Sequence, residues 1–123
     1  MHQPGERPTP TISPQELAQR LAGCEVELVD VRSLEEYAAG HIPGARHLPL
    51  QELTERWREL DPSVTYALIC RSGRRSAMAA HFLLSCGFVR VHNVDGGMLS
   101  WDGEVECLTP EELAEEANLR QQS

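Results

Sequence analysis

The sequence predicts a single α/β domain with a mostly parallel sheet of about five strands and helices on both faces. Short apolar segments typical of buried strands alternate along the chain with segments whose apolar residues recur at helical spacing. This alternation favours parallel strands joined by helical crossovers. The chain of 123 residues is long enough for one hydrophobic core, and its 41% hydrophobic and 24% charged residues are ordinary for a globular domain.

The first half of the chain contains three predicted strands and three predicted helices. The expected strand segments are residues 9–13, 27–31 and 46–48. The helical segments are residues 13–23, 33–40 and 50–60. Ser13 and Ser33 each stand three residues before a glutamate, which is the capping-box pattern of a helix start. Trp57 follows the helical spacing of the leucines in the third helical segment, so we expect it in the core.

The second half of the chain continues the alternation. Two further strands are expected at residues 65–69 and 90–94. The segment between them is rich in helix formers, with Ser76 as the expected N-cap and Gly87 as the stop. A glycine-rich turn at residues 95–97 then precedes a short helix that carries Trp101. Thr109 and Glu112 form a third capping box, which predicts an acidic helix through about residue 119.

The chain divides into three parts in this interpretation. Residues 1–10 contain three prolines, a glycine and charged residues, and they are expected to form a flexible N-terminal tail. Residues 11–105 contain the predicted strands, apart from the first two residues of the segment 9–13, and are expected to form the folded domain. Residues 106–123 are expected to form an acidic helical extension that packs on the domain, meets a partner or frays.

The composition limits the classes of function. A formal net charge of −8 argues against nucleic acid as the main partner. No apolar run approaches the roughly 20 residues of a membrane span, and the N-terminus lacks the apolar region of a signal peptide. We therefore expect a cytoplasmic protein without a membrane partner. The four cysteines lack the spacing of a metal site and nothing favours disulfides, so Cys107 is expected to be a bystander rather than a resolving thiol.

One loop combines the features of a nucleophilic site. Cys70 directly follows a predicted strand, and a helix is under way six residues later. The loop between them lies at a helix N-terminus, where free N–H groups and the helix dipole favour an anion. Arg71, Arg74 and Arg75 add positive charge, and Gly73 permits close backbone approach. These features lower the pKa of a cysteine from its usual ~8.5 and suit a nucleophile that receives an anionic substrate.

Other residues are expected at the same edge of the sheet as Cys70. Asp30 and Arg32 lie at the carboxyl end of the second strand, and the carboxyl ends of parallel strands share one edge. Three roles are open for these two residues. They support the site, or they contact the substrate, or they act only locally. In the local role, Asp30 caps the turn and Arg32 pairs with a glutamate of the next helix. His41 is expected to form hydrogen bonds or pack rather than carry protons. Met98 and Trp101 line the pocket or pack in the core.

The sequence Cys70-x-x-Gly73-x-Arg75-Ser76 resembles the active-site loop of the rhodanese family of sulfurtransferase domains. Two further stretches resemble signatures of that family. They are residues 29–32 followed by 35–37 and 40–45, and residues 95–98 with Trp101. The three motifs occur in the family's order and with its usual spacing, and the resemblance runs from about residue 12 to residue 105. It implies a rhodanese-like single domain.

The resemblance also implies a reaction and the residues that carry it. The Cys70 thiolate would take a sulfane sulfur from a small anionic donor such as thiosulfate, or from a persulfide, and pass it to cyanide or a thiol acceptor, which can belong to a partner protein. Asp30 and Arg32 would support the site, and no metal or organic cofactor is needed. The substrate-binding residues implied are those of the loop: Arg71, Ser72, Gly73, Arg74, Arg75 and Ser76.

Two other functions remain open from the sequence. A cysteine-dependent phosphatase or arsenate reductase uses a related loop with five residues between cysteine and arginine. Here Ser76 occupies that later position and Arg75 comes one residue earlier, which makes a tighter loop. A sulfur carrier or protein-interaction module is the second alternative. Arg75 either orients the donor or points inward and braces the loop against an acidic partner.

Overall fold

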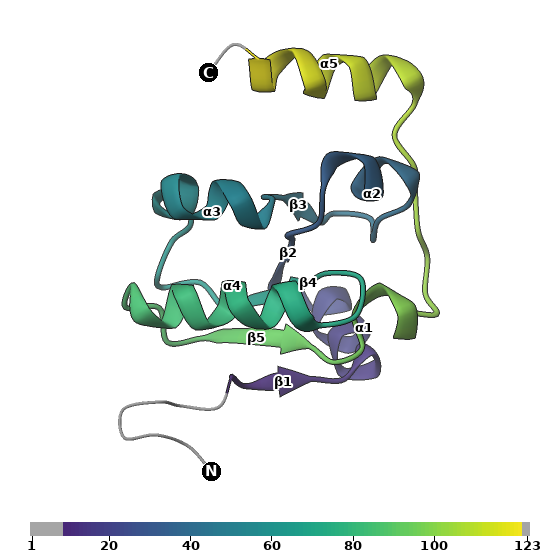
Figure 1. Cartoon of the computed structure of the whole chain (residues 1–123). Coiled ribbons are helices and arrows are strands. Elements are labelled where there is room, and N and C mark those ends of the chain that lie inside the picture. The colour runs from purple at the N-terminus through teal and green to yellow at the C-terminus, as the bar shows by residue number, and fades with distance from the viewer. Residues whose placement is uncertain (1–8, 122–123) are drawn as a thin grey trace.

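Five strands, all paired in parallel, form one sheet in the order β1-β5-β4-β2-β3. The computed structural model describes residues 9–121 (Figure 1). The strands are β1 (Thr11–Ile12), β2 (Glu27–Asp30), β3 (Arg46–His47), β4 (Tyr66–Ile69) and β5 (Val91–Val94). This sheet confirms the predicted α/β class. The central strand β4 is buried along its whole length because it has a neighbouring strand on each side and helices over both faces.

Helices connect the strands. They are α1 (Pro14–Ala22), α2 (Leu34–Ala39), α3 (Leu50–Arg56), α4 (Arg74–Ser85) and α5 (Pro110–Gln121), with short 3-10 helices η1 (Trp57–Glu59) and η2 (Gly97–Ser100). Two expected helices are shorter than predicted. The segment 50–60 changes to 3-10 geometry at Trp57, and the helix expected after residues 95–97 is a single 3-10 turn that ends before Trp101.

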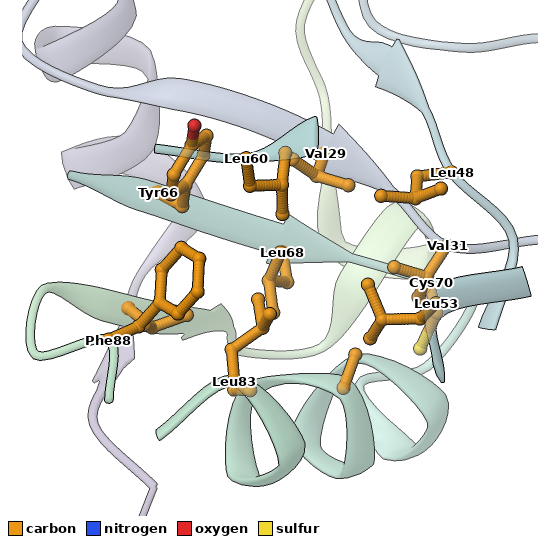
Figure 2. Close-up of a cluster of buried hydrophobic side chains, with 13 residues drawn as sticks. Val29, Val31, Leu48, Leu53, Leu60, Tyr66, Leu68, Cys70, Leu83 and Phe88 are labelled. Atoms are coloured by element: carbon orange, nitrogen blue, oxygen red, sulfur yellow. The ribbon is translucent and has the colours of Figure 1, made fainter. Parts of the chain in front are cut away.

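Two hydrophobic clusters, one on each face of the sheet, form the core. Successive residues of β4 alternate between them: Leu68 belongs to the cluster under α3 and α4, and Ala67 and Ile69 belong to the cluster beside α1. Figure 2 shows the first cluster, in which Phe88 and the α4 residue Leu83 pack against side chains of β4. Trp57 also packs against this cluster, as expected.

Side-chain caps begin three of the helices at the positions that the sequence predicts. The Ser33 hydroxyl accepts a hydrogen bond from the Glu36 N–H, and the Glu36 carboxylate accepts one from the Ser33 N–H. Thr109 and Glu112 form the same reciprocal pair at the start of α5. Ser13 caps α1 through a single bond from the Glu16 N–H, 3.0 Å long. Each cap satisfies N–H groups that the first helical turn leaves without a partner.

The expected N-cap of α4 is wrong. The helix begins at Arg74, and its N-cap is Gly73, which has a φ of +107°. A glycine adopts this left-handed conformation without the steric cost that a side chain would impose, so the chain turns into the helix early. Ser76 therefore lies inside the first turn of α4, where its side chain is buried rather than capping the helix.

The C-terminal part of the chain runs back along α2 and α3. Glu106 pairs with His41 through two backbone hydrogen bonds of 2.8 and 2.9 Å. Beyond this bridge, α5 lies above α2 and α3 in Figure 1, and Arg120 near its end contacts Glu52 and His47. In residues 9–121 no helix is long and apolar enough to cross a membrane. A flexible tail is expected at residues 1–10. Residues 1–8 of this segment lie outside the described part of the chain.

Candidate active site

Cys70 directly follows β4 and begins the loop that leads into α4. It is 1% exposed and belongs to the hydrophobic cluster shown in Figure 2. The buried strand carries the cysteine to the carboxyl edge of the sheet, and the left-handed Gly73 turns the chain back over it. The sulfur is therefore enclosed by its own loop, and the helix begins four positions after Cys70, at Arg74.

The loop supplies hydrogen-bond donors to the Cys70 sulfur. The Gly73 N–H donates to Sγ at 3.0 Å, and the Ser76 Oγ lies 3.2 Å from Sγ. Burial raises the pKa of the Cys70 thiol, but hydrogen bonds from the Ser76 hydroxyl and from the N–H groups of Ser76, Gly73 and Ser72 outweigh it, so that the pKa is lowered. Donors aimed at sulfur stabilise its anionic form, and the site therefore favours a reactive thiolate.

The three loop arginines lie in two different environments. Arg71 and Arg74 are exposed. Arg75 is half-buried and forms a two-pronged ion pair with Glu36 of α2, at 2.6 Å and 2.8 Å. The hydrogen bond from Arg75 is the largest influence on Glu36 and lowers the pKa of its carboxyl to about 2. Arg75 thus braces the first turn of α4, just after the loop, against α2, which is the inward of its two expected orientations.

The turn after β5 holds the beginning of the loop. The Met98 N–H donates to the Cys70 carbonyl at 2.8 Å, and the Leu99 N–H donates to the Arg71 carbonyl at 3.0 Å. Gly97 makes this approach possible, because a Cβ atom there would lie 2.5 Å from the Cys70 carbonyl oxygen. Met98 and Trp101 are half-buried and pack against the cluster beside α1, as the core interpretation expects.

Asp30 and Arg32 form a buried ion pair with each other. Arg32 Nη2 lies 2.7 Å from Asp30 Oδ2, and the Arg32 N–H and Nε each donate to Asp30 Oδ1 at 3.0 Å. The local alternative, in which Arg32 pairs with a glutamate of the next helix, is wrong, because Arg32 pairs with the fully buried Asp30. Arg32 also donates to the Gly40 carbonyl at 2.7 Å and so joins the end of β2 to the end of α2.

His41 packs within a stack of rings beside α2. Its ring stacks on Tyr37 at 3.8 Å, and the other face of Tyr37 stacks on His47 at 4.4 Å. Nδ1 of His41 lies 2.8 Å from the Tyr37 carbonyl oxygen, and Nε2 lies 3.3 Å from Glu106 Oε1. These contacts are those of a hydrogen-bonded, packed histidine, as expected.

One residue of the site was missed from the sequence. Asn93 of β5 is 8% exposed, and its Oδ1 lies 2.5 Å from the Ser76 Oγ. Its Nδ2 donates to the Gly73 carbonyl at 3.1 Å. The available signal was an amide side chain between apolar residues of a strand, next to His92, because a buried polar group needs a partner. The pattern does not say which partner that is.

The other three cysteines lie elsewhere, and all four are free thiols. Cys86 packs against the cluster that contains Cys70 as a partly buried apolar residue. Cys24 and Cys107 are exposed, and the Cys107 thiol donates to the Ala39 carbonyl at 3.1 Å. Among residues 9–121, no three His, Cys, Asp or Glu side chains are grouped so that they could hold a metal ion.

The fold and the loop define a class: an α/β domain with a cysteine cradled by backbone N–H groups where a parallel strand meets a helix. The family model of the rhodanese-like domain matches residues 13–104, and the chain belongs to this family. It resembles YrkF of Bacillus subtilis, provisionally named a sulfur carrier protein, with 43% identity over 79% of this chain and 53% of that protein. The chain thus spans about half the length of YrkF.

In two other matches, a larger share of the other protein is covered. The thiosulfate sulfurtransferase GlpE of Pseudomonas entomophila is 40% identical over 91 residues, which are 73% of this chain and 82% of that protein. The crystal structure of a rhodanese-like domain protein from Staphylococcus aureus matches with a TM-score of 0.76 and 32% identity. That match covers 82% of this chain and all of the other.

Proposed function

We propose that this chain is a rhodanese-type sulfurtransferase that transfers a sulfane sulfur through a persulfide on Cys70. The observation that carries the proposal is the pair of groups that can donate hydrogen bonds to an ionised Cys70 sulfur, the Gly73 N–H at 3.0 Å and the Ser76 hydroxyl at 3.2 Å. Membership of the rhodanese-like family supports it, as do relatives named as sulfurtransferases. We assign the activity to residues 11–105 and treat residues 106–123 as an extension.

The reaction has two displacement steps. The Cys70 thiolate attacks the terminal sulfur of thiosulfate, a sulfur–sulfur bond forms to Cys70, and the bond within thiosulfate breaks so that sulfite leaves with the electron pair. Cyanide or a thiolate then attacks the outer sulfur of the persulfide. The new bond forms to the acceptor, and Cys70 leaves as a thiolate, ready for another donor. Each step moves the negative charge within the loop, where the N–H groups stabilise it.

The loop residues divide into three roles in this proposal. The N–H groups of Ser72, Gly73 and Ser76 stabilise the anionic sulfur. Exposed Arg71 and Arg74 attract the anionic donor by charge, since neither forms an ion pair within residues 9–121. The ion pair of Arg75, and that of Asp30 with Arg32, hold the surrounding elements in place.

A phosphatase or arsenate reductase is less well supported. Both carboxylate oxygens of Glu36 accept hydrogen bonds from Arg75, so its guanidinium is already engaged by an acidic partner. The nearly complete burial of Cys70 favours a slender reactant, such as a terminal sulfur, over a tetrahedral oxyanion. Hydrolysis of an aryl phosphate that is lost in Cys70→Ser would reverse this preference.

A sulfur carrier that serves a protein partner is the second candidate. The specific observation is the surface beside the loop, where Leu99 is 64% exposed and Met78, one turn along α4 from Arg74, is 60% exposed. Exposed apolar side chains beside unpaired arginines fit an acidic protein acceptor better than a small molecule. Persulfide uptake without repeated turnover of thiosulfate and cyanide would favour the carrier.

The test is the intact mass of the protein after incubation with thiosulfate. We expect a gain of one sulfur atom in the wild type, reversed by cyanide or a thiol, and no gain in Cys70→Ser. Cys86→Ser is the matched control, because Cys86 packs against the same core cluster yet lies outside the loop, and it should gain sulfur like the wild type. If the wild type takes up no sulfur from thiosulfate or from a persulfide donor, the proposal is wrong.

A further inference from the structure

The Ser76 hydroxyl lies between two groups that can accept its hydrogen. Its Oγ is 3.2 Å from the Cys70 sulfur and 2.5 Å from Oδ1 of Asn93. A hydroxyl carries a single hydrogen and can donate to only one acceptor at a time. Ser76 therefore cannot donate to Cys70 and Asn93 together, although both contacts are present in the same structure.

The orientation of Asn93 shows which acceptor holds the hydrogen. The Nδ2 group donates to the Gly73 carbonyl at 3.1 Å, and this bond requires Oδ1 to be the atom that faces Ser76. Two oxygens at 2.5 Å need a hydrogen between them, and the amide Oδ1 has none to give. The Ser76 hydrogen thus points to Asn93, and the Ser76 oxygen is left to accept the S–H of a Cys70 thiol.

Ionisation of Cys70 reverses this arrangement. When the thiol loses its proton, the sulfur becomes a much stronger acceptor, and Ser76 can stabilise it only by turning its hydrogen away from Asn93. The buried Oδ1 then loses the donor that it had, which carries a free-energy cost. We propose that Asn93 is a positioning residue that competes with the Cys70 sulfur for the Ser76 hydrogen and so limits how readily Cys70 ionises.

This inference rests on the proposed function in that Cys70 is taken as the reacting nucleophile. Asn93 keeps the resting cysteine protonated up to a higher pH, while Ser76 remains in place to stabilise the anion as it forms. The hydrogen bond to Gly73 gives Asn93 a second effect on the loop, and the experiment must separate the two. The charged side chains on the elements that meet at the Cys70 loop are Asp30, Arg32, Glu36, Arg71, Arg74, Arg75 and Asp95. All of them are unchanged in the variants compared.

The test is a double-mutant cycle read as the pKa of Cys70. The rate of alkylation of Cys70 by iodoacetamide is measured against pH in the full chain, and peptide mass separates Cys70 from the other three cysteines. We expect Asn93→Ala to lower the pKa of Cys70 by about 0.5 to 1, which is about three- to tenfold more thiolate below that pKa. Ser76→Ala should raise the pKa, and adding Asn93→Ala to Ser76→Ala should change it no further.

The outcomes separate competition from a merely structural role. A pKa that is unchanged or raised by Asn93→Ala, or lowered equally with and without Ser76, would overturn the proposal. If circular dichroism shows that Asn93→Ala does not fold, the same cycle is run with Asn93→Asp. This variant should raise the pKa more with Ser76 present than in Ser76→Ala, and an equal rise would overturn the proposal. Alkylation needs no sulfur transfer, so failure to take up sulfur refutes the proposed function and leaves this result to be judged separately.

Discussion

Replacing Arg32 with alanine tests whether the Asp30–Arg32 pair supports the site or contacts the reactants. Asp30 is fully buried and the Arg32 side chain is 8% exposed. The substitution removes three contacts from the guanidinium to the Asp30 carboxylate and one to the Gly40 carbonyl, and leaves the Arg32 N–H as a donor. Breaking a buried pair from one side typically costs about 3–5 kcal/mol, because an unpaired charge stays buried.

The assay is equilibrium unfolding in urea followed by far-ultraviolet circular dichroism. With a slope of about 2 kcal/mol per M for a domain of this size, the Arg32→Ala midpoint should fall by about 1.5–2.5 M. Arg46→Ala is the matched control, because Arg46 also pairs with a glutamate but the two side chains are 44% and 41% exposed. Exposed pairs contribute about 0–1 kcal/mol, so this midpoint should fall by less than about 0.5 M.

Two results would refute the reasoning. One is an Arg32→Ala midpoint no lower than that of Arg46→Ala. The other is an undiminished midpoint together with loss of sulfur uptake at Cys70 in folded Arg32→Ala, which would make Arg32 a substrate contact. The double variant Asp30→Asn with Arg32→Met removes both charges and should recover much of the lost stability.

Three further predictions concern the loop and its surroundings. Gly97→Ala should lower the free energy of unfolding by about 3 kcal/mol or more, since φ is +57° and the new Cβ would lie 2.5 Å from the Cys70 carbonyl oxygen. Gly44→Ala is the control, because Gly44 has a φ of +85° but open space around it, and it should lower the free energy of unfolding by only about 1 kcal/mol. Both values are measured by thermal unfolding. Burial lowers the pKa of His47, so the unfolded chain binds its proton more readily and the melting temperature should fall as pH drops through the range near and below 6.5, less so in His47→Gln. The pKa of Glu36 is lowered from 4.5 to about 2, so the stability that its ion pair contributes is present above pH 4.5 and is lost towards pH 2. The loss should be only about 1 kcal/mol, because the pair with Arg75 is partly exposed. Glu36→Gln should not show this loss of stability with falling pH.

The strand and helix order could be predicted because it depends on local patterns. β4 appears in the sequence as an apolar run of strand formers, and Ser33 with Glu36 marks a helix start, since capping depends on residues three positions apart. The position of Cys70 at the end of β4 follows from the same run. These features need no knowledge of what packs against them.

The errors arose where two local signals competed. Ser76 is a good N-cap by residue type, but Gly73 offers a left-handed turn three residues earlier, and the helix begins there. Arg32 has acidic residues on both sides in the sequence. It pairs with Asp30, because Asp30 is buried and a buried carboxylate requires a partner. Residue type alone does not rank such choices.

The sequence by itself determined the α/β class, the order of the elements, the loop with its cysteine and three arginines, and the family resemblance that the family match later confirmed. Only the tertiary structure decided what each loop side chain contacts. Glu36 meets Arg75 across 39 positions of sequence, and Asn93 reaches Ser76 across 17, because the parallel sheet brings separate strand ends to one edge. Contacts of this kind depend on how elements pack, which no local pattern of residues encodes.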